Sequence, residues 1–228
     1  MDVQYKVISI GALEAHPLWN ERAEVRTGHA TTTLITAGDQ VILVDPSLPP
    51  QILQARLSER ANLTPDDVTH VFLTSFQPLR RRSLALFTKA QWLLFTAERE
   101  AIGLGLVVKL REAHEAGDAE LVDMLRSEVA LLERCRGTEE SICDGVDLFP
   151  LPGVTPGLCG LLLPTARATV LLCGDAVATV EHLEAGKVLP QCADVDQART
   201  SFAEALEIAD LLILGRDNVV LNPVRRPY

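Results

Sequence analysis

The segment at residues 71–81 constrains the fold more than any other part of this sequence. It begins with the apolar triplet Val71, Phe72 and Leu73 and passes at Thr74 into a polar loop. The apolar run predicts the buried end of a strand, and the polar residues predict a loop at the edge of a sheet. Since binding and catalytic groups are concentrated on loops held by a rigid scaffold, we expect this loop to form part of a functional site.

The rest of the pattern predicts an α/β protein. Apolar and β-branched runs predict further strands at residues 3–10, 31–36, 41–44, 91–95, 146–151, 160–163, 169–173 and 211–214. Helical spacing predicts helices at residues 50–60 and 194–209, and a short helix at 83–87. A helical insert is expected at about 96–140, with two or three helices joined near Gly117.

The composition excludes several classes of function. A net charge of −10 argues against nucleic acid and anionic membranes as partners, because phosphate contacts require clustered lysine and arginine. No apolar run approaches the ~20 residues of a membrane span, and the first residues do not have the pattern of a signal peptide. The five scattered cysteines form no CxxC pair. We therefore expect reduced thiols in a cytoplasmic protein.

Five short motifs occur in an order that resembles the metallo-β-lactamase-fold hydrolases. They are residues 44–46 (Val-Asp-Pro), 71–81, 152–157 (Pro-Gly-Val-Thr-Pro-Gly), 172–175 (Leu-Cys-Gly-Asp) and 214–218 (Leu-Gly-Arg-Asp-Asn). The resemblance covers nearly the whole chain and leaves out only the helical insert. It implies a single domain over residues 1–228, with an α/β fold of the four-layer αββα sandwich type. It also implies a site on loops at one edge of the two sheets.

The same resemblance indicates which positions would hold metal. Active members of the family bind two metal ions, usually zinc, which generate a hydroxide that attacks a carbonyl carbon or a phosphorus. The corresponding positions of this chain are Ser75, Gln77, Leu79, Arg80, Val154, Asp175 and Arg216. Only Asp175 is a competent ligand, because leucine and valine have no donor atoms and arginine is a fixed cation. We therefore expect no zinc site and no other cofactor.

The two arginines suggest what replaces the metals. In the family fold, the loops that carry Arg80 and Arg216 converge on Asp175, which would otherwise be a buried and unpaired carboxylate. We expect Asp175 to form an ion pair with one or both guanidinium groups. The alternative is that the loops have drifted, so that Arg80, Arg81 and Arg82 point to solvent.

Two other kinds of polar residue lie near these motifs. Asp45 ends the strand at 41–44, and we expect it to hydrogen-bond to nearby backbone. His29 and His182 either face the mouth of the pocket or are ordinary surface or hydrogen-bonded histidines, and the second interpretation is favoured.

Three functions are consistent with this reading. The favoured one is a non-catalytic homologue that keeps the fold as a scaffold, and that either binds a partner or forms part of a homodimer through the helical insert. The second is a module that binds a small anionic ligand through Arg80 and Arg216. The third is a metal-independent hydrolase of an ester or lactone, in which either Ser75 or Cys173 is the nucleophile or Asp175 and another carboxylate activate a water. No Ser-His-Asp or Cys-His spacing supports it. Enzymatic activity is therefore not expected.

Overall fold

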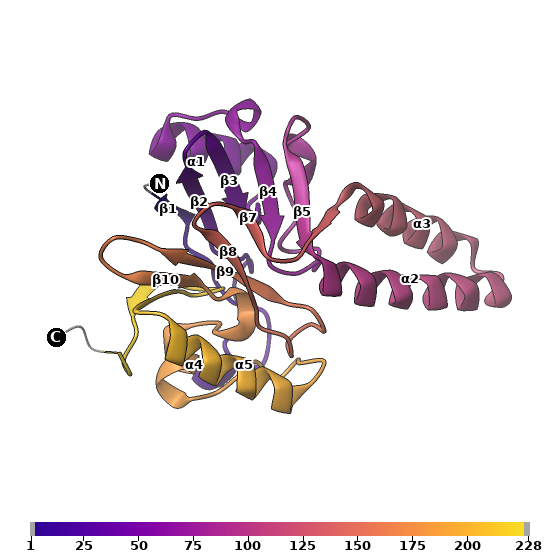
Figure 1. Ribbon diagram of the computed structural model, residues 1–228. Helices are drawn as coiled ribbons and strands as arrows, with labels where there is room; N and C mark the ends of the chain where they lie inside the picture. Colours follow the sequence, from indigo (N-terminus) through magenta and orange to yellow (C-terminus); the bar gives the residue numbers. More distant parts are fainter. Residues whose placement is uncertain (1–2, 226–228) are drawn as a thin grey trace.

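Two six-stranded sheets form the centre of the protein (Figure 1). The structure is a computed structural model that describes residues 3–225, so residues 1–2 and 226–228 of the predicted domain lie outside the described residues. The first sheet contains, in spatial order, β1 (Val3–Ser9), β2 (Thr32–Ala37), β3 (Gln40–Val44), β4 (His70–Leu73), β5 (Gln91–Phe95) and β6 (Arg136–Thr138). The second contains β12 (Val219–Leu221), β11 (Leu211–Ile213), β10 (Thr169–Leu172), β9 (Cys159–Pro164), β8 (Val146–Pro150) and β7 (Ser141–Cys143).

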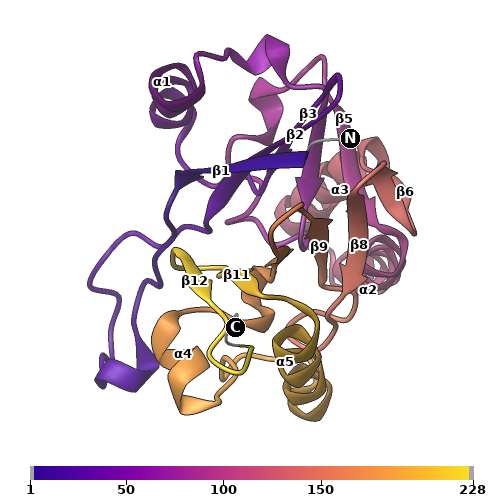
Figure 2. The same ribbon diagram turned by 60° about the vertical axis from the view of Figure 1, so that its left-hand side comes forward.

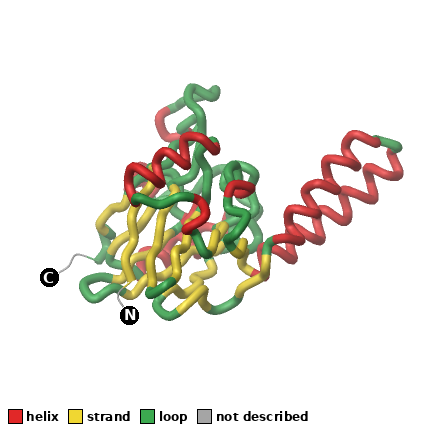
Figure 3. The backbone as a smooth tube through the Cα atoms, turned by 90° about the horizontal axis from the view of Figure 1, so that it is seen from above, coloured by secondary structure: helices red, strands yellow, loops and turns green. Residues whose placement is uncertain are grey.

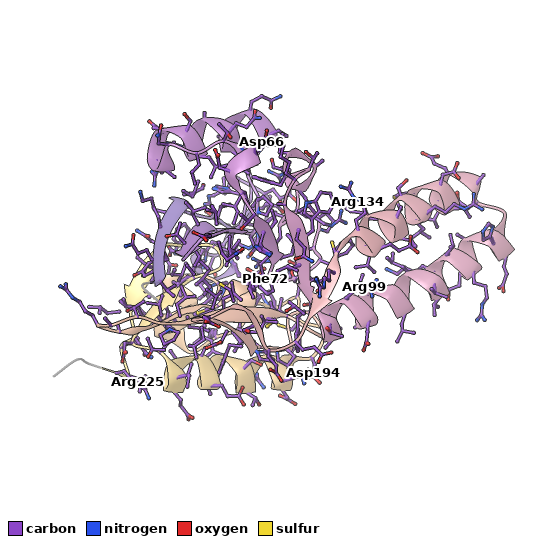
Figure 4. All side chains as sticks on the ribbon, turned by 45° about the horizontal axis from the view of Figure 1, so that its top comes forward. Asp66, Phe72, Arg99, Arg134, Asp194 and Arg225 are labelled. Atoms are coloured by element: carbon purple, nitrogen blue, oxygen red, sulfur yellow. The ribbon has the colours of Figure 1, made fainter. Side chains whose placement is uncertain are left out.

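Strand β4 shows why the central strands are apolar on both faces. Its side chains alternate between two cores, as expected for a strand buried on both sides. Phe72 points into the core between the two sheets, where it belongs to the same buried cluster as Ile42 and Leu161 (Figure 4). Val71 and Leu73 point the other way, into the core beneath the outer helix.

Helices cover the outer faces of both sheets and complete the four layers (Figure 2). Helix α1 (Pro50–Ala61) buries Leu53 and Leu57 in the outer core of the first sheet. Helices α4 (Val180–Ala185) and α5 (Val195–Ile208) lie on the second sheet, where α5 buries Phe202. The side chain of Asp194 caps α5 by accepting a hydrogen bond from the backbone of Gln197, as predicted. The αββα sandwich is therefore confirmed.

The predicted helical insert is a hairpin of two helices that projects from the side of the sandwich (Figures 1 and 3). Helix α2 (Thr96–Ala116) ends at Gly117, which adopts a left-handed φ of 71°. Asp118 then caps α3 (Ala119–Arg134) by accepting a hydrogen bond from the backbone of Leu121. The chain leaves α3 directly into β6, which pairs with β5 at the edge of the first sheet.

The sequence patterns missed several of the shortest elements, although they predicted the three-residue β11 from its apolar run. Strands β6, β7 and β12 have three residues each, which is too short for an alternating pattern to be visible. The six-residue helix α4 was also missed, and the short helix predicted at 83–87 is a 3₁₀ helix over Leu84–Leu86. Within residues 3–225, no helix combines the length and the apolar character that a membrane crossing requires.

Candidate functional site

Four loops meet where parallel strands of the two sheets end. Strands β3 and β4 run parallel, so the loops that begin at Asp45 and Thr74 leave the first sheet at the same edge. Strands β10 and β11 also run parallel, which brings the loops of Asp175 and Arg216 together at the edge of the second sheet. Gly215 permits this approach, because a Cβ atom there would lie 2.2 Å from the carbonyl oxygen of Gly174.

Arg80 lies at the centre of these loops and is fully buried, with 0% of its side chain exposed. Its Nη1 atom donates a hydrogen bond to the carboxylate of Asp45, and its Nη2 atom lies 2.6 Å from Oδ1 of Asp175. One guanidinium group therefore bridges two carboxylates that come from different sheets. The position of Arg80 contradicts the alternative in which the whole run Arg80, Arg81 and Arg82 faces solvent, although Arg82 is exposed.

Asp175 is held by a second arginine as well. Nε of Arg216 lies 2.8 Å from Oδ1 and its Nη2 lies 2.7 Å from Oδ2, which is a bidentate pair. The ion pairs predicted between Asp175 and the two arginines are thus present in the structure. Together with Asp45, these residues make a cluster of two carboxylates and two guanidinium groups, which we call the Arg80 cluster.

Asp45 takes part in this cluster in a way that the sequence did not reveal. It has a left-handed φ of 51°, which is uncommon outside glycine and is tolerated by aspartate. This conformation points its carboxylate at the following loop, where the backbone N–H and the hydroxyl of Thr74 donate to it at 2.9 and 2.7 Å. The backbone hydrogen bond was expected, whereas the ion pair with Arg80 was not.

The charges of the cluster shift the pKa values of its members. Burial tends to raise the pKa of Asp175, but Arg216 and Arg80 outweigh it and hold that pKa well below its usual range. Burial tends to lower the pKa of Arg80, but Asp175 and Asp45 raise it overall. For Asp45, burial raises the pKa and exceeds the opposing effect of Arg80 and Thr74. Asp175 and Arg80 are therefore a permanently ionised pair at neutral pH.

The other predicted metal-site positions bring no strong metal ligand to this cluster. Ser75 is fully buried, and its hydroxyl has no hydrogen-bond partner among the described residues. Gln77 and Leu79 are half-buried in the loop, and Val154 packs in the apolar core of the second sheet. That these seven positions mark a former metal site stays a prediction from the resemblance.

The donor set around Asp175 does not fit a zinc ion. Its nearest charged neighbours are the guanidinium groups of Arg80 and Arg216, whose positive charge opposes a second cation. Among residues 3–225, no group of three or more histidine, cysteine, aspartate or glutamate side chains is arranged to hold a metal ion. No hydrolytic step through a metal can be derived from this arrangement.

A buried carboxylate links the site to the helical hairpin. Glu98, in the first turn of α2, is fully buried and accepts hydrogen bonds of 3.0 Å from the backbone N–H groups of Phe76 and Gly157. It therefore ties together the loops at residues 74–80 and 152–158. No sequence pattern predicts this role, because Glu98 resembles an ordinary charged residue at the start of a helix.

Replacing Glu98 with alanine is expected to lower the free energy of unfolding by about 2–3 kcal/mol, because two buried N–H groups lose their acceptor. Urea denaturation monitored by circular dichroism measures this change. Glu112, which is exposed on the same helix, provides the control Glu112→Ala, for which we expect less than about 0.5 kcal/mol. Equal effects of the two substitutions would contradict the proposed role of Glu98.

A pocket of about 140 Å³ lies beside the cluster. Its walls include Arg216, Trp19 and His16, and the imidazole of His16 stacks on Trp19 with 4.2 Å between ring centroids. Neither histidine that we considered for the pocket mouth lines this pocket. His182 is buried, and Nε2 of His29 lies 2.9 Å from the carbonyl oxygen of Ile10, so His29 is a hydrogen-bonded polar residue.

In the wall of the pocket, Thr179 lies between two imidazole rings. Its hydroxyl oxygen lies 3.0 Å from Nε2 of His16 and 2.9 Å from Nδ1 of His182. Glu181 also approaches Nε2 of His16, at 3.1 Å. A catalytic triad requires the carboxylate and the nucleophile on opposite ring nitrogens, so this arrangement is not a triad. Burial and the neighbouring His16 lower the pKa of His182, which favours its neutral form.

Comparison with solved structures shows what the chain resembles as a whole. A protein of Thermotoga maritima that was assigned to the metallo-β-lactamases matches with a TM-score of 0.69 and 19% identity, over 97% of this chain and 100% of that one. AidC, a dizinc quorum-quenching lactonase, matches with a TM-score of 0.68 and 14% identity, over 99% of this chain and 89% of that one.

A Staphylococcus aureus protein described as a metal-dependent hydrolase also matches, with a TM-score of 0.69 and 14% identity over 98% of this chain and 93% of that one. No protein-family model matches the sequence, and no curated protein has a significantly similar sequence. At these identities, the structural matches establish a shared fold.

Proposed function

Because this chain has the metallo-β-lactamase fold, we propose that it is a non-catalytic member of that fold, a scaffold or binding protein without the dinuclear metal centre. The observation that carries this proposal is the position of Arg80, whose buried guanidinium group bridges Asp45 and Asp175. Arginine side chains engage both carboxylates of the cluster, so neither is free to ligate a metal ion.

Metal analysis tests this proposal directly. Protein purified without chelators is expected to contain far less than one zinc per chain by inductively coupled plasma mass spectrometry. Excess Zn²⁺ should leave the melting temperature unchanged, because a ligand stabilises a protein only if it binds the folded state. One or two bound zinc ions per chain, with a rise in melting temperature that EDTA reverses, would contradict the proposal.

Binding of a small anionic ligand is a second candidate function. Its site would contain only one of the two arginines that the sequence suggested. Arg80 cannot contribute, because it is fully buried between two carboxylates. Arg216 binds Asp175 through Nε and Nη2, which leaves Nη1 outside this pair, and it lines the pocket beside Trp19. A carboxylate bound there would change the fluorescence of Trp19, so titration with acetate or a short acyl carboxylate tests this candidate.

A metal-independent hydrolase receives the least support. Both nucleophiles considered from the sequence, Ser75 and Cys173, are fully buried. Burial also raises the pKa of the Cys173 thiol, which disfavours the reactive thiolate. The five cysteines, which form no disulfide among the described residues, support the proposal that the protein is cytoplasmic.

A further inference from the structure

The helical hairpin carries an apolar face that no other part of residues 3–225 covers. Leu106, Leu110 and Ala113 of α2 face α3, where they pack against Val122 and Leu125. A second set of α2 residues at helical spacing, which includes Leu104 and Val107, faces away from that contact. Leu104 is 72% exposed and Val107 is 64% exposed, which is unusual for large apolar side chains on one surface.

These side chains line a groove of about 450 Å³ between the two helices. Its apolar walls are formed by Gly103, Leu104 and Val107 of α2 and by Val129 and Leu132 of α3. We call this groove the hairpin groove. It lies on the helical arm that projects from the sandwich (Figure 3).

The arm is fixed to the body at its base. Arg81, from the loop after β4, forms an ion pair with Glu128 of α3. Nε of Arg99 donates to the carbonyl oxygen of Cys135 at 2.9 Å, and the guanidinium of Arg134 lies 3.9 Å from the ring centroid of Trp92 (Figure 4). These contacts join the base of the hairpin to the body of the protein.

Gly103 leaves one wall of the hairpin groove without a side chain. Glycine in the interior of a helix costs about 1 kcal/mol relative to alanine. Packing within one chain does not require glycine here. A Cβ atom at position 103 would meet only Leu132, at an ordinary contact distance of 3.7 Å. The missing side chain leaves a depression beside Leu104 that an apolar side chain from outside can fill.

The charged residues on this face of α2 are arranged so that a second copy of α2 is complementary to it. Glu100, Leu104, Val107 and Arg111 recur at i, i+4, i+7 and i+11 and so lie on one side of α2. Glu100 lies at one end of the apolar pair and Arg111 at the other. An antiparallel second copy of α2, centred between residues 105 and 106, places Leu104 opposite Val107 and Glu100 opposite Arg111, twice by symmetry.

We propose that the hairpin groove binds a second copy of this chain, through an antiparallel two-fold contact between the α2 helices. Helices of 21 and 16 residues give the hairpin a face of roughly 600 Å² in projection. If α3 joins the contact beside α2, this face reaches the lower end of the ~600–1,000 Å² per partner that specific interfaces bury. The dimer would give the proposed scaffold protein a binding partner. The dimer proposal is independent of the proposed absence of a metal centre, because each can be true without the other.

The oligomeric state tests the interface. The protein is expected to be a dimer in analytical ultracentrifugation at roughly 10–100 µM chain, and Leu104→Glu is expected to convert it to a monomer with an unchanged circular dichroism spectrum. The control is Ile52→Glu on α1, where Ile52 is 50% exposed outside the groove, and it should remain a dimer. A monomeric wild type, a dimeric Leu104→Glu variant or a monomeric Ile52→Glu variant would each overturn the proposal.

Charge reversal tests the antiparallel register. Glu100→Arg and Arg111→Glu should each raise the dissociation constant about tenfold or more, because like charges then meet twice across the two-fold axis. The double variant Glu100→Arg/Arg111→Glu should restore the wild-type constant within about threefold. Arg111 also lies 3.8 Å from Glu115 in its own helix, so Glu115→Ala is the control for loss of that contact alone. A double variant as weak as the single ones would overturn the antiparallel arrangement.

Discussion

Replacing Arg80 with methionine is expected to lower the free energy of unfolding by about 3–5 kcal/mol, since it removes one member of a buried ion cluster. Methionine fills much of the arginine volume, so the loss is mainly electrostatic. Asp45 and Asp175 would then remain buried with one cation fewer between them. Denaturation in guanidinium chloride, followed by tryptophan fluorescence and circular dichroism, measures the change.

Two further variants separate the electrostatic effect from a general loss of packing. Arg56→Met removes an exposed ion pair with Glu59 and should cost less than about 1 kcal/mol. Arg80→Met/Asp45→Asn also removes the stranded charge of Asp45 and should recover part of the lost stability. If the double variant is no more stable than Arg80→Met, the loss is a packing effect and the electrostatic explanation is wrong.

Replacing Asp175 with asparagine is expected to destabilise the protein by about 3 kcal/mol at pH 7, by an amount that depends on pH in a defined direction. Arg216 and Arg80 hold the pKa of Asp175 well below its usual range in the folded protein. In the unfolded chain an aspartate takes up its proton near pH 4. The stabilisation by the carboxylate is thus complete above about pH 5 and is lost as the pH falls through the folded pKa.

Urea titrations of both proteins at several pH values measure this dependence. The difference in unfolding free energy between wild type and Asp175→Asn should be constant from about pH 5 to pH 8 and should shrink below about pH 4. Asp45 is present in both proteins, so its own titration largely cancels in the difference. A difference that is the same at pH 3 as at pH 7 would contradict the ionised pair.

Much of the fold was visible in the sequence because its central strands are buried on both faces. Runs such as residues 71–73 and 91–95 are short, apolar and bounded by turns, and the structure places strands there. The short strands at the sheet edges were not predictable in this way. Arg136 and Thr138 are in β6 only because β5 offers them backbone partners, which is a tertiary effect.

The cluster was partly predictable for a different reason. The resemblance supplied the positions of Arg80, Asp175 and Arg216 on converging loops, and elementary electrostatics then required a partner for the aspartate. Asp45 was assigned only a backbone hydrogen bond, because the direction of its side chain depends on a left-handed φ that no sequence pattern reports. The role of Glu98 depends on two N–H groups from distant loops, which also cannot be read from its neighbours in the sequence.

The Arg80 cluster also joins the two halves of the chain. Asp45 and Arg80 follow strands of the first sheet, whereas Asp175 and Arg216 follow strands of the second. In a protein that closes such a seam with metal ions, completion of the fold depends on the supply of the ions, because binding and folding are coupled. A guanidinium group, in contrast, is part of the polypeptide and does not have to be supplied by the cell. The final docking of the two halves can therefore proceed as soon as both have been translated, in a cell replete with zinc or starved of it.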